Sequence, residues 1–441
     1  MTPIFKKGDR SEASNYRPVS LTSVCSKLCE HIVAKAIMSH LEVNNILSDF
    51  QHGFRAKRSC ETQLISFWDE IVKSSSAGGQ TDVVIMDFSK AFDIVPHNLL
   101  LHKLQYLGIQ SHALDWVKSF LTNRRQRVAV DGVFSAYAPV CSGVPQGSVL
   151  GPVLFLCYIN DMPTCVSSKL RLFADDSIIY RPIKSLSDCL ALQRDLLSLE
   201  SWEATWGMRF HPEKCNVMRM TRRKSPILHQ YTLKGHTLVA VANAKYLGVT
   251  LSGDLTWNSH IDAITNKSNR TLGFVRRNIQ TGSLRAKCMA YTTLVRPNLE
   301  YCSSVWDPHQ NNLISQLEAV QRRAARYACH NYQRSASVTE MINKLKWQTL
   351  QNRRETQKLI MLYKIVNSIV SINILNHAKK SCRATRSNHQ HNYIPISTTT
   401  SYHKGSFFPS VIPIWNGLPE HLKTTGKLEQ FKIGLAAYQA K

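Results

Sequence analysis

The segment Leu170–Tyr180, LRLFADDSIIY, places two adjacent aspartates between two apolar runs. Apolar runs rich in Leu, Ile, Phe and Tyr around a short polar pair predict a β-hairpin with Asp175 and Asp176 at its tip. Aspartates are also common in ordinary turns, where they bond their own backbone and stay solvated. The segment therefore predicts an acidic hairpin and leaves its role open.

A second apolar strand ending on a carboxylate lies upstream, in Asp82–Phe88, DVVIMDF. The run Val83–Met86 predicts a buried strand that ends at Asp87. If this strand pairs with the hairpin, three carboxylates meet and repel one another unless cations neutralise them. Carboxylate oxygens suit Mg²⁺ or Mn²⁺. We therefore expect Asp87, Asp175 and Asp176 to hold two ions, an arrangement suited to in-line displacement at phosphorus.

Basic side chains near the N-terminus are candidates to bind a triphosphate. Lys6 and Lys7 lie in a basic turn, and Arg17, whose guanidinium offers a planar fork of donors, precedes a proline. The alternative is a solvated basic surface. Arg124, Arg125 and Arg127 lie in Asn123–Val130, which leads from a basic turn into a strand. They are candidates to contact backbone phosphates, with solvated turn arginines as the alternative.

Four further residues suit a nucleotide pocket. Phe92 follows Asp87 closely enough to form a floor that would exclude a 2′-hydroxyl, although core packing is the commoner role of Phe. In Ser142–Pro152, SGVPQGSVLGP, Gly147 allows close backbone approach and Gln146 is placed to hydrogen-bond a base, or the segment is only a turn opening a helix. Lys214 is a candidate proton donor to pyrophosphate, or a solvated charge.

Composition points to a large basic protein with a polyanionic partner. The 441 residues are 43% hydrophobic, enough for a large core and more than one domain. The 55 Lys and Arg against 30 Asp and Glu give a net charge of +25, and residues 251–441 hold 26 basic and 9 acidic side chains. Nucleic acid is the first candidate partner and an anionic membrane surface the second.

Cysteine spacing and hydropathy indicate a soluble intracellular protein. The 12 cysteines include no Cys-x-x-Cys pair, so reduced thiols are expected instead of disulfides or a zinc tetrad. Cys382, His389 and His391 come nearest to a metal cluster but lack a fourth ligand. The longest apolar run, Val149–Ile159, is too short to span a bilayer, so no membrane partner is expected.

Periodic apolar residues predict helices over Val24–Leu41, Thr62–Lys73, Leu99–Leu107, Leu186–Trp206, Leu317–Ala328 and Trp347–Val366. Tyr246–Val249 is predicted to be a short strand. From Ile261 onward the chain is expected to be helical and basic. Asn376–Ser406 is polar without periodicity and is expected to be a linker or disordered.

Taken together, the motifs PIFKKGD, NYRPVSL, GFR, MDFSKAFD, SGVPQGSVLGP, FADD and KYLGV resemble, in content and order, the reverse transcriptase of non-LTR (LINE-type) retrotransposons, most of all the jockey-like branch. The similarity continues through LEYCSSVWDP to WNGLP and so covers essentially the whole chain. It implies an α+β right-hand polymerase fold with an antiparallel palm sheet. The implied domains are fingers and palm over 1–252, a basic helical thumb over 253–370, a polar linker over 371–406 and a C-terminal docking segment over 407–441.

The resemblance also implies an activity and its partners. These are RNA-directed DNA polymerisation with an RNA template, a DNA primer, deoxynucleoside triphosphates and two Mg²⁺ or Mn²⁺ ions. Residues that match the family's functional positions are Asp87, Asp175 and Asp176 as catalytic metal ligands, Phe92 as sugar gate, Gln146 as nucleotide contact, Lys214 as the motif lysine, and Lys6, Lys7 and Arg17 as triphosphate contacts.

The sequence departs from the family at its start. Full-length elements of this kind carry an endonuclease domain upstream, whereas Met1 here almost abuts the first motif. We therefore expect a truncated copy, which puts target-site cleavage in doubt. The alternative to an active polymerase is an inactive RNA-binding remnant. Whether the compartment is the nucleus or the cytoplasm stays open.

Overall fold

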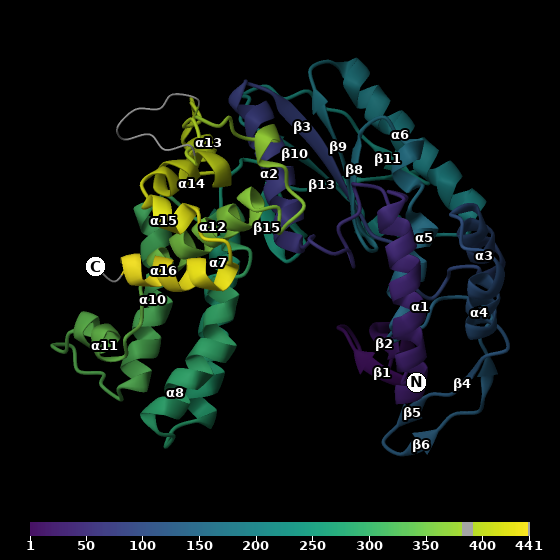
Figure 1. Ribbon diagram of the computed structural model, residues 1–441, viewed down its shortest axis with the longest axis horizontal. Helices are drawn as coiled ribbons and strands as arrows, with labels where there is room; N and C mark the ends of the chain where they lie inside the picture. The colour runs from purple at the N-terminus through teal and green to yellow at the C-terminus, as the bar shows by residue number, and fades with distance from the viewer. Residues whose placement is uncertain (382–390, 440–441) are drawn as a thin grey trace. The chain divides into compact units, whose positions relative to one another are not determined.

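The computed structural model describes residues 1–381 and 391–439 (Figure 1). Cys382 and His389, two of the three metal ligands considered above, lie outside the described residues. The chain divides into two compact units. The first comprises 1–56, 82–218 and 227–240, and the second comprises 57–81, 219–226 and 241–441. This division differs from the predicted boundary at 252, because residues 57–81 and 219–226 group with the second unit.

The first unit is built on one sheet and the helices that pack on it. Its helices are α1 (Val24–Val43), α3 (His97–Tyr106), α4 (Ser111–Leu121), α5 (Leu150–Ile159) and α6 (Leu186–Trp206). Among the described residues the sheet has five strands in the order β13-β10-β3-β9-β8. Their bounds are β13 (Val239–Ala240), β10 (Asn216–Thr221), β3 (Gln80–Met86), β9 (Asp176–Ile183) and β8 (Lys169–Phe173).

Strand direction confirms the predicted hairpin but not a wholly antiparallel sheet. β8 and β9 pair antiparallel, with Phe173 opposite Asp176. β13 instead runs parallel to β10, with Asn216 opposite Val239. The prediction of an antiparallel sheet is wrong at this edge. The connection from β10 to β13 is long enough to carry the chain back and let it run in the same direction.

Apolar side chains of the sheet and helices form one core in the first unit. Val83 and Val84 are neighbours on β3 and both are fully buried, so this central strand is covered on both faces. Helix α5 is buried nearly all round. It shares the core with Ile37 of α1, Leu104 of α3 and Leu196 of α6. The core therefore holds β3 and the β8–β9 hairpin in fixed relation.

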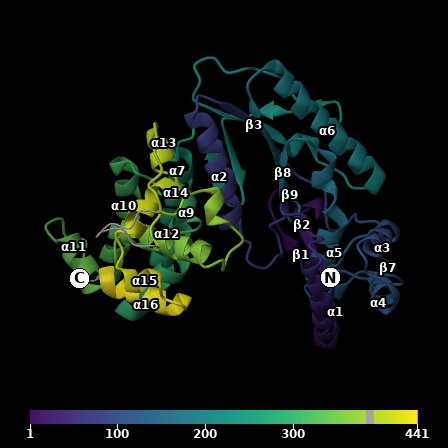
Figure 2. The same ribbon diagram turned by 45° about the horizontal axis from the view of Figure 1, so that its top comes forward.

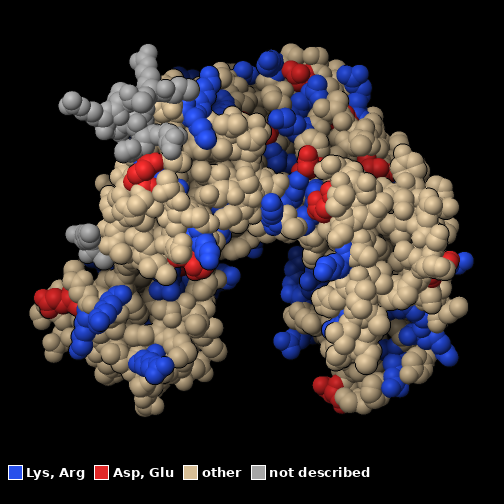
Figure 3. Space-filling model, viewed as in Figure 1, with Lys and Arg blue, Asp and Glu red and all other residues tan. Residues whose placement is uncertain are grey.

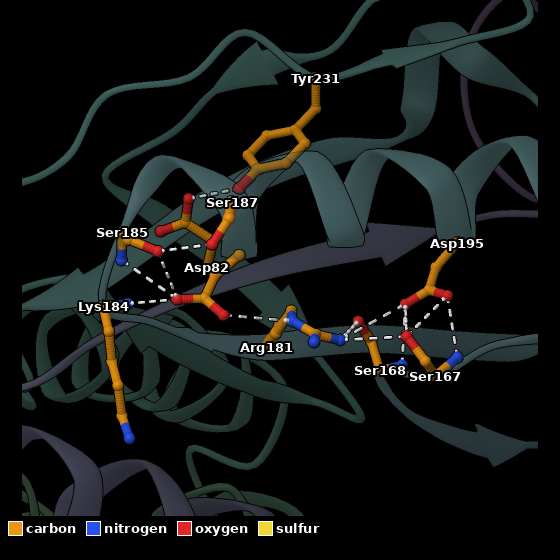
Figure 4. Close-up of polar contacts among 10 residues, drawn as sticks. Asp82, Ser167, Ser168, Arg181, Lys184, Ser185, Ser187, Asp195 and Tyr231 are labelled. Atoms are coloured by element: carbon orange, nitrogen blue, oxygen red, sulfur yellow. Dashed lines mark hydrogen bonds and ion pairs between the residues drawn. The ribbon is translucent and has the colours of Figure 1, made fainter.

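A polar network ties α6 to the hairpin strands (Figure 4). The Asp195 carboxylate of α6 accepts the backbone N–H groups of Ser167 and Ser168, each at 2.8 Å. Arg181 of β9 donates to the hydroxyls of both serines and lies 3.9 Å from Asp195. At the start of α6, Asp188 accepts the N–H of Ser185 at 3.1 Å and completes a capping box. These bonds help to hold α6 against β9. The ribbon views show α6 beside the sheet of the first unit (Figures 1 and 2).

Tyr231 adds a second polar anchor in the first unit. It precedes the small hairpin of β11 (Thr232–Leu233) and β12 (His236–Thr237). Its hydroxyl donates to the buried Asp82 carboxylate of β3 at 2.8 Å (Figure 4). Burial raises the pKa of the Tyr231 hydroxyl, and the nearby Asp82 charge raises it further. The hydroxyl therefore stays protonated and remains a donor.

The second unit is mainly helical. Its longer helices are α2 (Cys60–Ser76), α7 (Asn258–Asn278), α10 (Asn311–Ala328), α12 (Leu350–Val366), α14 (Phe407–Asn416) and α16 (Leu428–Gln439). The shorter ones are α8 (Leu284–Ala290), α9 (Ser303–Trp306), α11 (Val338–Lys344), α13 (Ser401–Lys404) and α15 (Glu420–Lys423). Five predicted helices in the two units appear as α1, α2, α3, α10 and α12 with ends shifted by a few residues, and α6 has the predicted bounds.

Two expectations about the second unit are corrected. Tyr246–Val249 is not a strand but the turn between β14 (Asn243–Tyr246) and β15 (Val249–Ser252). Leu247 and Gly248 both have positive φ, as a tight two-residue turn requires. Within the expected linker, Tyr393 is buried and its backbone exchanges two hydrogen bonds with the Asn416 side chain. That part of the segment is therefore packed, because a polar side chain supplies the partners that periodic apolar residues would not reveal.

Among the helices of the described residues, none combines the length and the hydrophobicity needed to cross a bilayer.

His260 of α7 gives the second unit a pH-dependent stability. It is buried, and its Nδ1 accepts the Thr250 N–H at 3.2 Å. Burial lowers the pKa of His260 from 6.5 to about 4. Between these values the unfolded chain binds more protons, so the free energy of unfolding rises with pH. It should fall by up to about 3 kcal/mol on acidification from pH 7 to 4.

The measurement is urea unfolding between pH 4 and 7, followed by tryptophan fluorescence, to which Trp306 contributes with its ring centre 5.0 Å from that of His260. His260→Asn keeps an acceptor for Thr250 and should flatten the pH dependence. His421→Gln changes an exposed histidine of the same unit and should leave it unaltered. An unchanged slope in His260→Asn would show that another group titrates.

Candidate active site

The tip of the β8–β9 hairpin is a two-residue turn of Ala174 and Asp175. Phe173 and Asp176 are the last paired residues, so Asp175 lies in the turn and Asp176 begins β9. Ala174 has a φ of +54°, as the first central residue of a primed turn does. The two carboxylates are thus consecutive but lie in different structural positions.

A loop from the beginning of the chain braces this turn. The Gln51 side-chain oxygen accepts the N–H groups of Gly53 and Ala174, at 2.7 and 3.0 Å. A Cβ on Gly53 would lie 2.3 Å from the Ala174 nitrogen, so only glycine fits there. Sequence reasoning assigned no role to Gln51, although it stands two residues before the GFR motif. We interpret Gln51 and Gly53 as positioning residues for Asp175.

Asp87 follows β3 and lies beside the hairpin, because β3 and β9 are neighbours in the sheet. The Ser177 hydroxyl oxygen of β9 is 3.5 Å from the Met86 carbonyl oxygen of β3. The Asp87 carbonyl accepts the His211 N–H at 2.8 Å, which brings in the segment that carries Lys214. The structure therefore places Asp87, Asp175, Asp176 and Lys214 together.

Lys214 pairs directly with the first of these carboxylates. Its Nζ lies 3.4 Å from Asp87 Oδ2. The two side chains are 52% and 42% exposed, so water screens the pair and its net stabilisation is small. The ammonium is therefore free to exchange Asp87 for an anionic ligand at little cost.

The electrostatics of the hairpin tip are unfavourable in the absence of cations. Burial, together with the smaller effects of the Asp175 and Asp87 charges, raises the pKa of Asp176 to about 6. Burial also raises the pKa of Asp175, with a further upward contribution from Asp87, whereas Arg17 and Lys6 lower it. The pKa values of Asp175 and Asp176 thus depend on the neighbouring carboxylates, and that of Asp175 also depends on Arg17 and Lys6.

The donor set suits a hard divalent cation in its chemistry. Three carboxylates that repel one another are the oxygen ligands preferred by Mg²⁺ and Mn²⁺. In residues 1–381 and 391–439, no three His, Cys, Asp or Glu side chains are grouped closely enough to hold a metal ion as they stand. The fit therefore rests on the identity and mutual repulsion of the donors, with no preformed cage.

Most of the predicted site residues line one open cavity of about 1340 Å³. Predicted residues that line it are Lys6, Arg17, Asp87, Phe92, Gln146, Asp175, Asp176 and Lys214. Lys7 and Gly147 are not among the lining residues that the structure describes. Both lysines are exposed in the segment that follows Phe5, and of the two only Lys6 reaches the cavity wall.

The backbone conformation and the close neighbours of Gly147 require a glycine at this position. Its φ is +101°, and a Cβ there would lie 2.8 Å from the Ser20 carbonyl oxygen. Ser20 in turn donates its N–H to the Gln146 carbonyl at 2.7 Å. Gly147 therefore lets the chain after β2 (Tyr16–Val19) approach the turn, and β2 pairs with β1 (Thr2–Phe5), with Arg17 opposite Ile4.

The Phe92 backbone is tied to Val144, two residues before Gln146. The Val144 N–H donates to the Phe92 carbonyl at 2.7 Å. The Phe92 ring stacks on Phe155 of α5, with ring centres 4.3 Å apart. Phe92 thus both packs on the core and lines the cavity, so the two alternatives for this residue are not exclusive.

Asp93 is a fourth cavity carboxylate that the sequence reasoning missed. Its Oδ1 accepts the Gln146 Nε2–H at 2.8 Å. Burial raises the pKa of Asp93, while Gln146, Lys90, Lys6 and Arg17 lower it. Its place in MDFSKAFD, six residues after Asp87, was the available signal. Gln146 is thus oriented by Asp93.

Carboxylates at the tip of a sheet hairpin, faced by basic side chains across an open cavity, define a class of site that binds a phosphate-bearing substrate together with divalent cations. The reverse transcriptase (RNA-dependent DNA polymerase) family matches residues 4–251, which is more than half of the chain. The chain belongs to this family. Residues 4–251 accordingly have a reverse-transcriptase-like polymerase fold.

Curated relatives agree with the resemblance inferred from the motifs and confirm it. The chain is 30% identical over 363 residues to a probable RNA-directed DNA polymerase from transposon BS of Drosophila melanogaster, covering 77% of this chain and 39% of the relative. It is 29% identical over 329 residues to the RNA-directed DNA polymerase from mobile element jockey of the same organism, covering 72% and 36%. The chain thus spans less than half the length of these relatives.

Solved structures with some similarity include the apo telomerase from Candida tropicalis, at a TM-score of 0.41 and 9% identity over 78% of this chain and 54% of that one. The RNA-dependent RNA polymerase of a human picobirnavirus has a TM-score of 0.41 and 11% identity over 79% and 62%.

Proposed function

We propose that this chain is an RNA-directed DNA polymerase that extends a primer 3′-hydroxyl with deoxynucleoside triphosphates along an RNA template. The observation that supports this most directly is the meeting of Asp87 with Asp175 and Asp176 at a cavity that Lys6 and Arg17 also line. In this proposal the sheet of the first unit is the palm and 253–370 is the thumb. The family and the relatives named above supply the reaction class.

Each cavity residue then has a role that its position supports. Arg17 and Lys6 bind the triphosphate, since their charges already act on Asp175 across the cavity. Phe92, held by Phe155, forms the floor under the sugar. Lys214 leaves Asp87 and donates a proton to the departing pyrophosphate.

We further propose that Asp87, Asp175 and Asp176 hold two Mg²⁺ or Mn²⁺ ions. Such ions, when bound, lower the pKa of an attacking hydroxyl and neutralise charge on the phosphate oxygens. The repulsion that raises the pKa of Asp176 supports this, because a cation between the carboxylates removes it.

Primer extension by the purified chain tests the proposal. On poly(rA) primed with oligo(dT), we expect dTTP incorporation that requires Mg²⁺ or Mn²⁺ and stops with EDTA. A second readout is independent of activity: divalent ions should raise the melting temperature by mass action, and Asp175→Asn should weaken this effect. RNA binding that needs no divalent ion, with no extension under any metal condition, would favour the remnant and contradict the polymerase.

A further inference from the structure

A separate hairpin of the first unit, residues 124–140, offers an exposed surface next to the cavity. Its base pairs β4 (Arg125–Gln126) with β7 (Ala138–Pro139), and its tip pairs β5 (Ala129–Val130) with β6 (Val133–Phe134). The tip turn is Asp131-Gly132, with φ of +49° and +83°, which fits a tight two-residue turn. The Ala129 N–H donates to the Met1 carbonyl at 2.9 Å, so the hairpin is tied to the start of β1. It is therefore an ordered projection.

Two aromatic rings on this hairpin face solvent. Phe134 is 55% exposed and Tyr137 is 53% exposed. The Arg127 guanidinium carbon lies 3.9 Å from the Phe134 ring centre and 5.0 Å from that of Tyr137. These contacts hold the rings in place before any ligand binds, so less conformational entropy is lost when a ligand stacks on them.

The charge of the hairpin is complementary to a phosphate backbone. Arg124, Arg125 and Arg127 are basic, and Asp131 at the tip is the one acidic residue between 124 and 140. Arg124 lines the cavity together with Gln126 and Val128, so this surface begins at the cavity wall. In the space-filling view, Lys and Arg side chains appear around β4 and β5 (Figure 3).

We infer that the 124–140 hairpin binds a single strand of nucleic acid, with Phe134 and Tyr137 stacking on bases and Arg125 and Arg127 contacting phosphates. The inference rests on the proposed function, in which this strand is the unpaired template outside the cavity. Base faces are accessible to aromatic side chains in single strands, whereas in a duplex they are stacked on one another. The hairpin should therefore discriminate single strands from duplexes.

The test is fluorescence anisotropy of the full chain with labelled single-stranded RNA, single-stranded DNA and duplex RNA. It is done without Mg²⁺ or nucleotides over a range of salt concentrations. The double variant Phe134→Ala/Tyr137→Ala should bind both single strands about 10- to 100-fold more weakly, with an unchanged salt slope. Arg125→Ala/Arg127→Ala should instead reduce the slope of log affinity against log salt by roughly 1.4. Duplex affinity should stay within about twofold in the ring variant.

Matched controls separate stacking from loss of fold or charge. Phe134→Tyr/Tyr137→Phe keeps both rings and should bind like the parent protein. Tyr106→Ala removes a tyrosine that is 87% exposed at the end of α3, and Lys35→Ala removes one exposed charge from α1. Neither should reproduce the selective loss on single strands.

Two outcomes would overturn the inference. One is unchanged single-strand binding in the ring variant, and the other is an equal loss on single strands and duplex. The binding assay needs no catalysis. A chain that fails to polymerise can therefore still show selective single-strand binding by the 124–140 hairpin. Conversely, loss of single-strand binding by the hairpin need not abolish polymerisation. In the ring variant, extension of a primer with a one-nucleotide template overhang should survive even though binding to long overhangs is lost.

Discussion

Asp175→Asn is expected to reduce primer extension on an RNA template by on the order of a thousandfold or more. The substitution keeps the size of the side chain but removes the charge that the proposed ions need. Asp87→Asn should cause a similar loss, since Asp87 lies beside the hairpin and its charge acts on both Asp175 and Asp176. The measurement is the rate of dTTP incorporation at saturating Mg²⁺. Activity that survived either change would contradict the proposed site.

Asp176→Asn should be less damaging than Asp175→Asn. Asp175 lies in the turn that Gln51 braces, whereas Asp176 is the first residue of β9. Neighbouring residues at a strand end point to different sides, so the two carboxylates should not contribute equally. The opposite order of effects would mean that the hairpin geometry at the tip is different.

Stability provides the control for these variants. The ion-free protein carries repulsion among these carboxylates, so each Asp→Asn change should leave the melting temperature unchanged or raise it. Asp115→Asn, on the exposed side of α4, should change neither activity nor stability. A large fall in the melting temperature of Asp175→Asn would mean that lost activity reports lost folding.

Phe92→Val should relax the choice of sugar. Removing the ring opens the cavity floor, so the preference for dTTP over UTP on poly(rA) should fall by roughly 10- to 100-fold. The loss of the stack on Phe155 should also cost about 1–2 kcal/mol of folding free energy. Single-nucleotide incorporation with each substrate measures the first effect and urea unfolding the second.

Phe92→Tyr is the matched variant for this test. It keeps the ring as a steric barrier, so the sugar preference should stay close to that of the parent protein. If Phe92→Val lost stability but kept its preference for dTTP, the ring would be only a core residue and the floor would lie elsewhere in the cavity.

Local patterns were sufficient for most helices and for the hairpin. Helix α6 has the predicted bounds because its leucine spacing and its serine cap are features of one continuous segment. The β8–β9 hairpin follows from apolar runs around a short turn. The strand that ends before Asp87 follows from an apolar run that is buried on both faces.

Residues whose roles depend on a distant partner escaped the same reasoning. Gln51 bonds Ala174 across 123 residues, and Asp93 bonds Gln146 across 53. Lys7 was grouped with Lys6 because the two are adjacent, yet only Lys6 lines the cavity among the described residues. The parallel course of β13 beside β10 is also a pairing that no local pattern encodes.

Residue type and spacing along this chain set which segments become helices or strands, and they marked the acidic and basic side chains suited to phosphate chemistry. Tertiary structure alone decided that Asp87 lies beside the hairpin turn, that Gly53 leaves room for Ala174, and that Asp93 orients Gln146. The physical reason is that periodicity and turn preference act over a few neighbouring residues, whereas these contacts arise when a buried core closes loops tens to more than a hundred residues long.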